Sequence, residues 1–105
     1  MDSWRPITKD EFSRLFDTQY EELDEDERKV FDRYRVNPWK AVIRRSERAG
    51  DEPVLVVAQS NDGVLYFEDV EHGFNISPVD QSGRILMPGG SQNTLNGAVR
   101  EWFTP

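Results

Sequence analysis

The sequence contains no cysteine and only one histidine, His72. Without cysteine, disulfide bonds, thiolate zinc sites, iron–sulfur clusters and cysteine nucleophiles are excluded. A single histidine limits acid–base catalysis by an imidazole to one position. No apolar run approaches the roughly 20 residues of a membrane span, and the first residues lack the apolar segment of a signal peptide. We therefore expect a cytoplasmic protein with no membrane contact.

Length and aromatic content indicate one folded domain. The chain has 105 residues, and its three Trp, three Tyr and six Phe are more aromatic side chains than a disordered chain of this length usually carries. A chain of this length normally forms a single core. No linker or internal repeat divides it, so we expect residues 1–105 to be a single domain.

Lysine and arginine are missing from two long stretches of this acidic chain, whose net charge is −7. Residues 17–27 hold seven acids and no base, residues 28–48 hold eight bases and two acids, and residues 51–80 again hold seven acids without Lys or Arg. The blocks either neutralise each other across the fold or leave an acidic face for a basic partner. The overall charge argues against nucleic acid, which is itself a polyanion.

The chain between Pro6 and Pro38 has the pattern of helix. Thr8 and Glu11 have the spacing of a capping box, in which each side chain bonds to the other residue's backbone N–H. Apolar and aromatic side chains follow at helical spacing. They are Phe12, Leu15, Phe16, Tyr20, Leu23, Val30, Phe31 and Tyr34.

This region forms one long helix or two short ones. A single helix over residues 9–36 would be about 42 Å long at 1.5 Å per residue, which is long for a small domain. Asp24 and Glu27 repeat the capping-box spacing inside a gap in the apolar stripe. The second box favours two helices, over residues 9–22 and 25–35.

Strand patterns begin after Pro38. Residues 39–45 carry clustered bases that suit an edge strand, and residues 47–52 have the composition of a loop. Residues 54–58 form a continuous apolar run typical of a central strand. Asn61-Asp62-Gly63 predicts a tight hairpin turn, since such turns need positive φ and Asp-Gly supplies it, and residues 64–68 form the returning strand.

Two further turns and a helix complete the expected fold. Turns at residues 71–73 and 80–83 lead into strands over residues 74–77 and 84–87. Ser91 can cap a closing helix with one apolar face. That face consists of Leu95, Ala98, Val99 and Trp102. The prediction is an α+β fold with an N-terminal helical region, a four- to five-stranded antiparallel meander, and a C-terminal helix packed on the sheet.

Only one cluster combines the residue types of a metal or catalytic site. Glu68, Asp69, Glu71 and His72 supply carboxylates and an imidazole, but their spacing matches no established metal-binding or catalytic motif, and Gly73 ends the strand there. We expect no metal and no cofactor. An enzyme that uses the Glu68–His72 cluster remains an alternative.

Bases also alternate with aromatics over residues 33–48, as they do in single-strand nucleic-acid binders, although the acidity of the whole chain argues against that partner. Trp4 and Trp39 lie outside the periodic apolar stripes and are candidates for a contact surface. A small-molecule-binding or regulatory domain is a further alternative, with a pocket between sheet and helices lined by Tyr66, Phe74 and Trp102.

Our leading hypothesis is a noncatalytic protein-binding module with an acidic surface. An inhibitor or immunity-type partner of a basic protein needs a stable scaffold and anionic side chains, but no active site. The binding residues that this hypothesis names are Glu21, Glu22, Asp24, Glu25, Asp26, Trp4 and Trp39.

Overall fold

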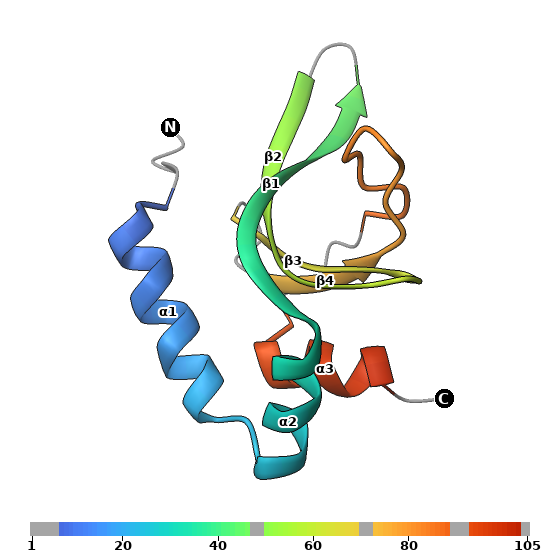
Figure 1. The fold of residues 1–105 in the computed structure, drawn as a ribbon. Helices are drawn as coiled ribbons and strands as arrows, with labels where there is room; N and C mark the ends of the chain where they lie inside the picture. The colour runs from blue at the N-terminus through green and yellow to red at the C-terminus, as the bar shows by residue number, and fades with distance from the viewer. Residues whose placement is uncertain (1–6, 47–49, 70–72, 89–92, 104–105) are drawn as a thin grey trace.

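Helices precede and follow a four-stranded antiparallel sheet, which confirms the predicted α+β class (Figure 1). The computed structural model describes residues 7–46, 50–69, 73–88 and 93–103. In chain order the elements are α1 (Lys9–Glu21), α2 (Glu25–Tyr34), β1 (Arg35–Ser46), β2 (Gly50–Ser60), β3 (Gly63–Glu68), β4 (Gly73–Ser77) and α3 (Leu95–Phe103).

The N-terminal region forms two helices, and both predicted capping boxes are present. The Thr8 hydroxyl accepts from the Glu11 backbone N–H at 3.1 Å, and the Glu11 carboxylate accepts from the Thr8 N–H. Asp24 and Glu27 repeat the exchange at 2.7 and 2.9 Å. The second box starts a new helix, so the chain turns between α1 and α2 instead of continuing as one rod.

The strands pair in the order β1-β2-β3-β4, each antiparallel to its neighbour. Ser60 pairs with Gly63 at the predicted hairpin, so the turn itself consists of Asn61 and Asp62. Gly63 does not have the positive φ that we expected glycine to supply. Glycine is needed at position 63 because the backbone of Ser77 lies close to it. A Cβ on Gly63 would lie 2.6 Å from the carbonyl oxygen of Ser77.

Two strands are longer than the sequence predicted. β1 begins at Arg35 and runs through Pro38, where its pairing with β2 is irregular. Proline is tolerated there because β1 is an edge strand, which does not need every N–H for a ladder bond. The expected loop over residues 47–52 was wrong for residues 50–52, which pair with β1. Residues 47–49 lie outside the described part of the chain.

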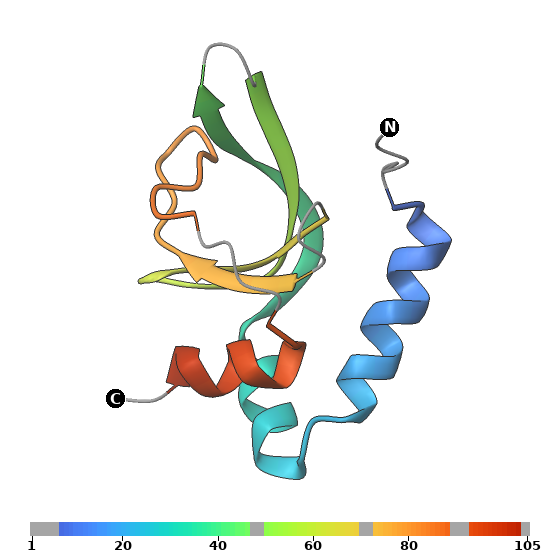
Figure 2. The same ribbon diagram turned by 180° about the vertical axis from the view of Figure 1, so that it is seen from behind.

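Residues 84–87 do not form a fifth strand. Residues 78–88 instead face β1 and β2 across the concave side of the sheet (Figures 1 and 2). The Val42 N–H donates to Gly83 O at 3.0 Å, and the Ile85 N–H donates to Val42 O at 2.8 Å. These two bonds give only one isolated bridge, between Val42 and Arg84, because the chain turns sharply at Gly83, whose φ is +84°.

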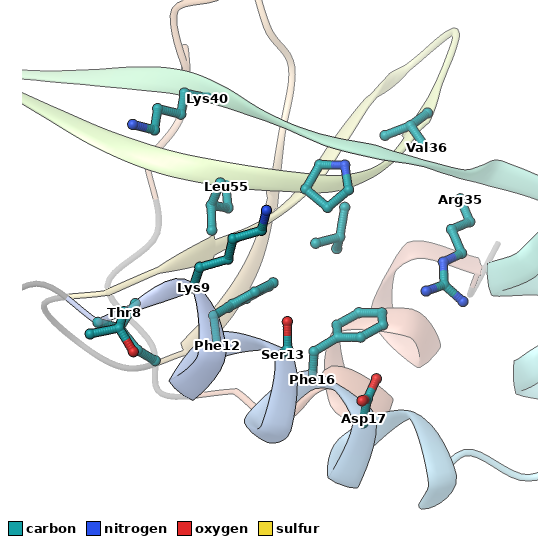
Figure 3. Close-up of a pocket in the computed structure, with 13 residues that line it drawn as sticks. Thr8, Lys9, Phe12, Ser13, Phe16, Asp17, Arg35, Val36, Lys40 and Leu55 are labelled. Atoms are coloured by element: carbon teal, nitrogen blue, oxygen red, sulfur yellow. The ribbon is translucent and has the colours of Figure 1, made fainter.

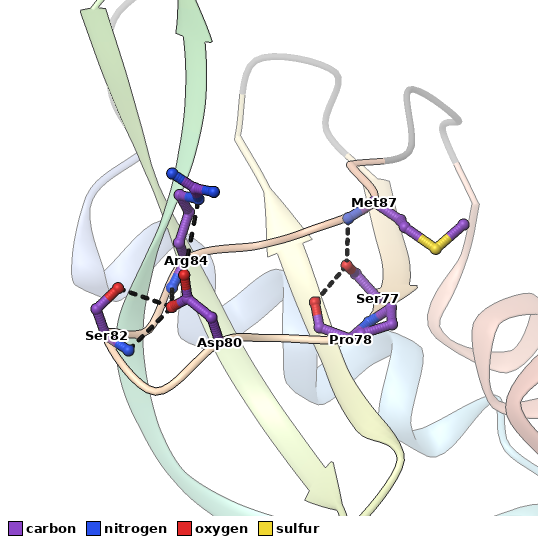
Figure 4. Close-up of polar contacts among 6 residues, drawn as sticks. All are labelled: Ser77, Pro78, Asp80, Ser82, Arg84 and Met87. Carbon is purple, nitrogen blue, oxygen red and sulfur yellow. Dashed lines mark hydrogen bonds and ion pairs between the residues drawn. The ribbon is translucent and has the colours of Figure 1, made fainter.

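Asp80 organises that turn (Figure 4). One carboxylate oxygen accepts from the Ser82 N–H at 2.9 Å, the Ser82 hydroxyl at 2.7 Å and the Arg84 N–H at 3.0 Å. The bond from the Arg84 backbone, followed by the one from the Ser82 hydroxyl, lowers the pKa of Asp80 below its ordinary value. At the other end of the segment, Ser77 Oγ accepts from the Met87 N–H at 2.9 Å.

The sheet has a hydrophobic core on each face. Leu65 and Phe67 point toward the three helices, while Val64 and Tyr66 point toward the 78–88 segment, as strand alternation requires. All four side chains are at most 1% exposed. On the helical side, α3 contributes the predicted face, with Leu95, Ala98 and Val99 buried and Trp102 packed at its edge.

Candidate functional site

Five acidic side chains surround the turn between α1 and α2, and we call this set the acidic corner. Its members are Glu21, Glu22, Asp24, Glu25 and Asp26. All five are exposed. The turn lies at the end of α1 away from the chain's N-terminus, at the bottom of Figure 1. The structure therefore brings these predicted residues together on one exposed part of the surface.

A set of side chains beneath the acidic corner fixes its backbone. Leu23 is buried at 3% exposure and belongs to the main core. Arg28 Nη2 donates to the carbonyl oxygens of Glu21 and Leu23 at 3.1 and 3.2 Å, and its guanidinium lies 5.2 Å from the Tyr20 ring centre. These contacts tie the backbone of the turn to the main core and to α2.

Tyr20 links this turn to α2. Its hydroxyl donates to the Asp32 carboxylate at 2.8 Å. Burial, followed by the hydrogen bond to Asp32, raises the pKa of the Tyr20 phenol above its ordinary value. The phenol therefore stays protonated and keeps donating through the neutral pH range.

Internal pairing neutralises only part of the acidic stretch. The Asp24 side chain caps α2, and Glu25 forms an exposed ion pair with Lys29 at 3.7 Å. Glu27, next to the corner, pairs with Arg100 of α3. Within the described part of the chain, no cation pairs with the carboxylates of Glu21, Glu22 or Asp26.

Two of these carboxylates oppose the helix dipole. Glu21 is the last residue of α1 and Glu22 is its C-cap, and the last turn of α1 contains no basic residue. Negative charge at a helix C-terminus costs about 0.3–1 kcal/mol per group at an exposed site. Asp26, in the first turn of α2, has the favourable position instead. Helix stability therefore does not explain acids at positions 21 and 22.

The tryptophans do not join the acidic corner in the described structure. Trp4 lies outside the described residues. Trp39 lies on β1, which begins at the C-terminal end of α2, whereas the acidic corner lies at the N-terminal end of α2. The Trp39 side chain is half-buried against the core between the sheet and the 78–88 segment. Its Cζ3 atom would lie 3.4 Å from a Cβ on Gly83. The Trp39 ring thus packs over the 78–88 turn, and its role as a contact residue stays a prediction.

Two of the four residues of the Glu68–His72 cluster lie in the described part of the chain. Glu68 is fully buried, and the Asp69 carboxylate accepts from the Ile7 N–H at 2.7 Å. Glu71 and His72 lie outside the described residues. Among the residues that are described, no group of three or more potential ligands could hold a metal ion. The enzyme alternative at this cluster therefore stays a prediction.

The small-molecule pocket that we hypothesised does not lie where we placed it. Tyr66 and Phe74 are fully buried in opposite cores, and Trp102 lines a separate shallow hollow of about 390 Å³. A larger groove of about 670 Å³ lies between α1 and strands β1 and β2 (Figure 3). Sequence reasoning missed it, because its two lysines, Lys9 and Lys40, are distant in the chain and come to line one groove only through the packing of α1.

No family model matches the chain, and neither the curated proteins nor the solved structures that were compared include a match. No helix within the described residues is long and apolar enough to cross a membrane.

Proposed function

We propose that the protein is a noncatalytic binding module of the cytoplasm that attaches to a basic protein through the acidic corner. The observation that carries this proposal is the uncompensated charge there. Glu21, Glu22 and Asp26 are exposed and have no cationic partner among the described residues. The turn that carries them is braced by Arg28 and Leu23. An inhibitor or immunity-type protein needs this combination of fixed backbone and available anions.

Charge and rigidity contribute to binding in different ways. Exposed carboxylates attract a basic surface over about 10 Å at moderate salt, which raises the association rate. A turn that is already ordered avoids the entropy cost of fixing a loop on binding. Glu21 and Glu22 also lie where the dipole of α1 disfavours them, and a residue that breaks a local stability rule is a candidate for function.

The test is capture of a partner from the native cell by the wild type and by a Glu21→Lys/Glu22→Lys variant. We expect the wild type to retain a basic protein that the variant loses, and we expect added salt to weaken the purified complex. The substitutions place cations at the C-terminus of α1, so the melting temperature of the variant should rise. A rise in melting temperature with loss of capture excludes unfolding as the cause.

A matched variant controls for net charge. Asp10→Lys/Asp62→Lys changes the charge by the same amount at two exposed positions outside the corner. This control should still capture the partner. Equal capture by the corner variant and the wild type, or retention of partners that are not basic, would contradict the proposed function.

A further inference from the structure

The groove between α1 and the strands combines an apolar floor with a cationic rim (Figure 3). Phe12 and Phe16 of α1 line it on one side, and Leu55 and Val57 of β2 line it on the other. Phe12, Phe16 and Val57 belong to the main core. The floor is therefore the edge of a packed core.

Positive charge predominates around this floor. Lys9, Arg35 and Lys40 line the groove, whereas Asp17 is its one acidic lining residue in the described structure. Figure 3 shows Lys9 extending from α1 toward the strands and Lys40 extending from the facing strand. Neither lysine forms an ion pair within the described residues. The two lysines thus contribute unpaired positive charge to opposite walls of one groove.

Arg35 closes the other end of the groove. Its guanidinium lies 5.1 Å from the ring centre of Phe16 and 5.3 Å from that of Tyr20. Cation–π contacts of this kind hold the group in place without removing its charge. The local charge of the groove is therefore opposite in sign to that of the chain as a whole.

We propose that this groove binds a small amphipathic organic anion, with its hydrocarbon body on the aromatic and aliphatic floor and its carboxylate between Lys9 and Lys40. The volume of about 670 Å³ lies within the range of small-molecule sites, about 300–1,000 Å³. A neutral apolar ligand would use the floor alone, and a cation would meet three like charges. This site is separate from the acidic corner, and its existence does not depend on the proposed protein partner.

The probe is octanoate, titrated into the labelled full chain and followed by amide chemical shifts. Octan-1-ol and octyltrimethylammonium carry the same hydrocarbon chain with a neutral and a positive head. We expect saturable shifts at α1 and β1 around Lys9 and Lys40. Octanoate should bind several-fold more tightly than octan-1-ol, since each of its two exposed ion pairs contributes up to about 1 kcal/mol, which is a factor of about five. Octyltrimethylammonium should bind most weakly.

Two variants separate the contributions of charge and space. Lys9→Gln/Lys40→Gln should reduce octanoate affinity to that of octan-1-ol and leave octan-1-ol affinity unchanged. Ser13→Trp, at an exposed position that lines the groove, should block both ligands. The matched controls are Lys29→Gln and Thr18→Trp, at exposed positions of α2 and α1 that do not line the groove. Both controls should bind as the wild type does.

Four outcomes would overturn the inference. Equal affinity for octanoate and octan-1-ol would show that the cations take no part. Shifts centred on the hollow beside Trp102 would place the ligand outside the groove. The absence of saturable shifts would show that octanoate does not bind. Tighter binding of a peptide of alternating leucine and glutamate than of octanoate, at the same residues, would make the occupant a polypeptide.

Discussion

Replacement of Gly63 by alanine tests the close contact between β3 and β4. The new Cβ would lie 2.6 Å from the Ser77 carbonyl oxygen and 3.1 Å from its carbonyl carbon. Both are backbone atoms of the paired strand, so no side-chain rotation relieves the overlap. Gly63 and Val64 must move away from Ser77, which opens the ladder at the pair Val64–Ser77.

The expected cost follows from this overlap. Forcing extra atoms into a packed region costs about 1–3 kcal/mol, whereas the loss of glycine's unfolded-state entropy returns about 0.4–1 kcal/mol. The net destabilisation should be about 1–2 kcal/mol. For a domain of this size, it lowers the melting temperature by roughly 4–16 °C at about 4–8 °C per kcal/mol.

Gly97→Ala is the matched control, measured by thermal and urea unfolding beside Gly63→Ala. Its Cβ would meet the Asn93 side-chain oxygen at 2.8 Å, and that oxygen is at the end of a side chain that can rotate. Because Gly97 lies within α3, alanine there should leave stability unchanged or raise it by up to about 1 kcal/mol. If Gly63→Ala were as stable as the wild type, the contact with Ser77 would not constrain the sheet.

Two further predictions concern the core and the 78–88 turn. Phe31 is fully buried and contacts the rings of Phe16 and Tyr20, so Phe31→Ala should lower the free energy of unfolding by about 3–5 kcal/mol in urea titrations. The hydrogen bonds to Asp80 lower the pKa of its carboxyl group in the folded state. The ionised carboxylate therefore stabilises the fold at pH values above the unfolded-state pKa. This stabilisation is lost as the pH falls through the folded-state pKa. Melting temperatures from pH 7 down to pH 2.5 should show Asp80→Asn less stable than the wild type at neutral pH, with the gap closing below about pH 4. A gap that stayed constant over this range would refute the titration argument.

Sequence reasoning succeeded where the determining interactions are local. The Thr8–Glu11 and Asp24–Glu27 exchanges each span three residues, so their spacing predicted both helix starts. The turn at Asn61-Asp62 is equally local. The positions of the acidic side chains around the α1–α2 turn followed from the same spacing, and this is why the predicted corner residues are found together.

Tertiary contacts decided the features that were missed. β1 extends back to Arg35 because that residue pairs with Ala58 of β2, a partner that no local pattern identifies. Residues 84–87 read as a strand by composition, yet only Arg84 and Ile85 make bridges, and both directly follow the turn at Gly83. The groove likewise depends on the distance of α1 from β1 and β2. The apolar periodicity of each element does not predict that distance.

The charges of α1 connect the two proposed sites. Lys9 is the first residue of this helix and Glu21 the last, so the helix carries a cation at its N-terminus and an anion at its C-terminus. Both positions are the reverse of what the helix dipole favours, and together they cost about 0.6–2 kcal/mol if each exposed charge costs about 0.3–1 kcal/mol. The capping box at Thr8 and the aromatic contacts of Phe12 and Phe16 stabilise α1 without either charge. Local helix stability therefore does not account for Lys9 or Glu21, whereas an anionic ligand at one end of α1 and a basic partner at the other would account for both.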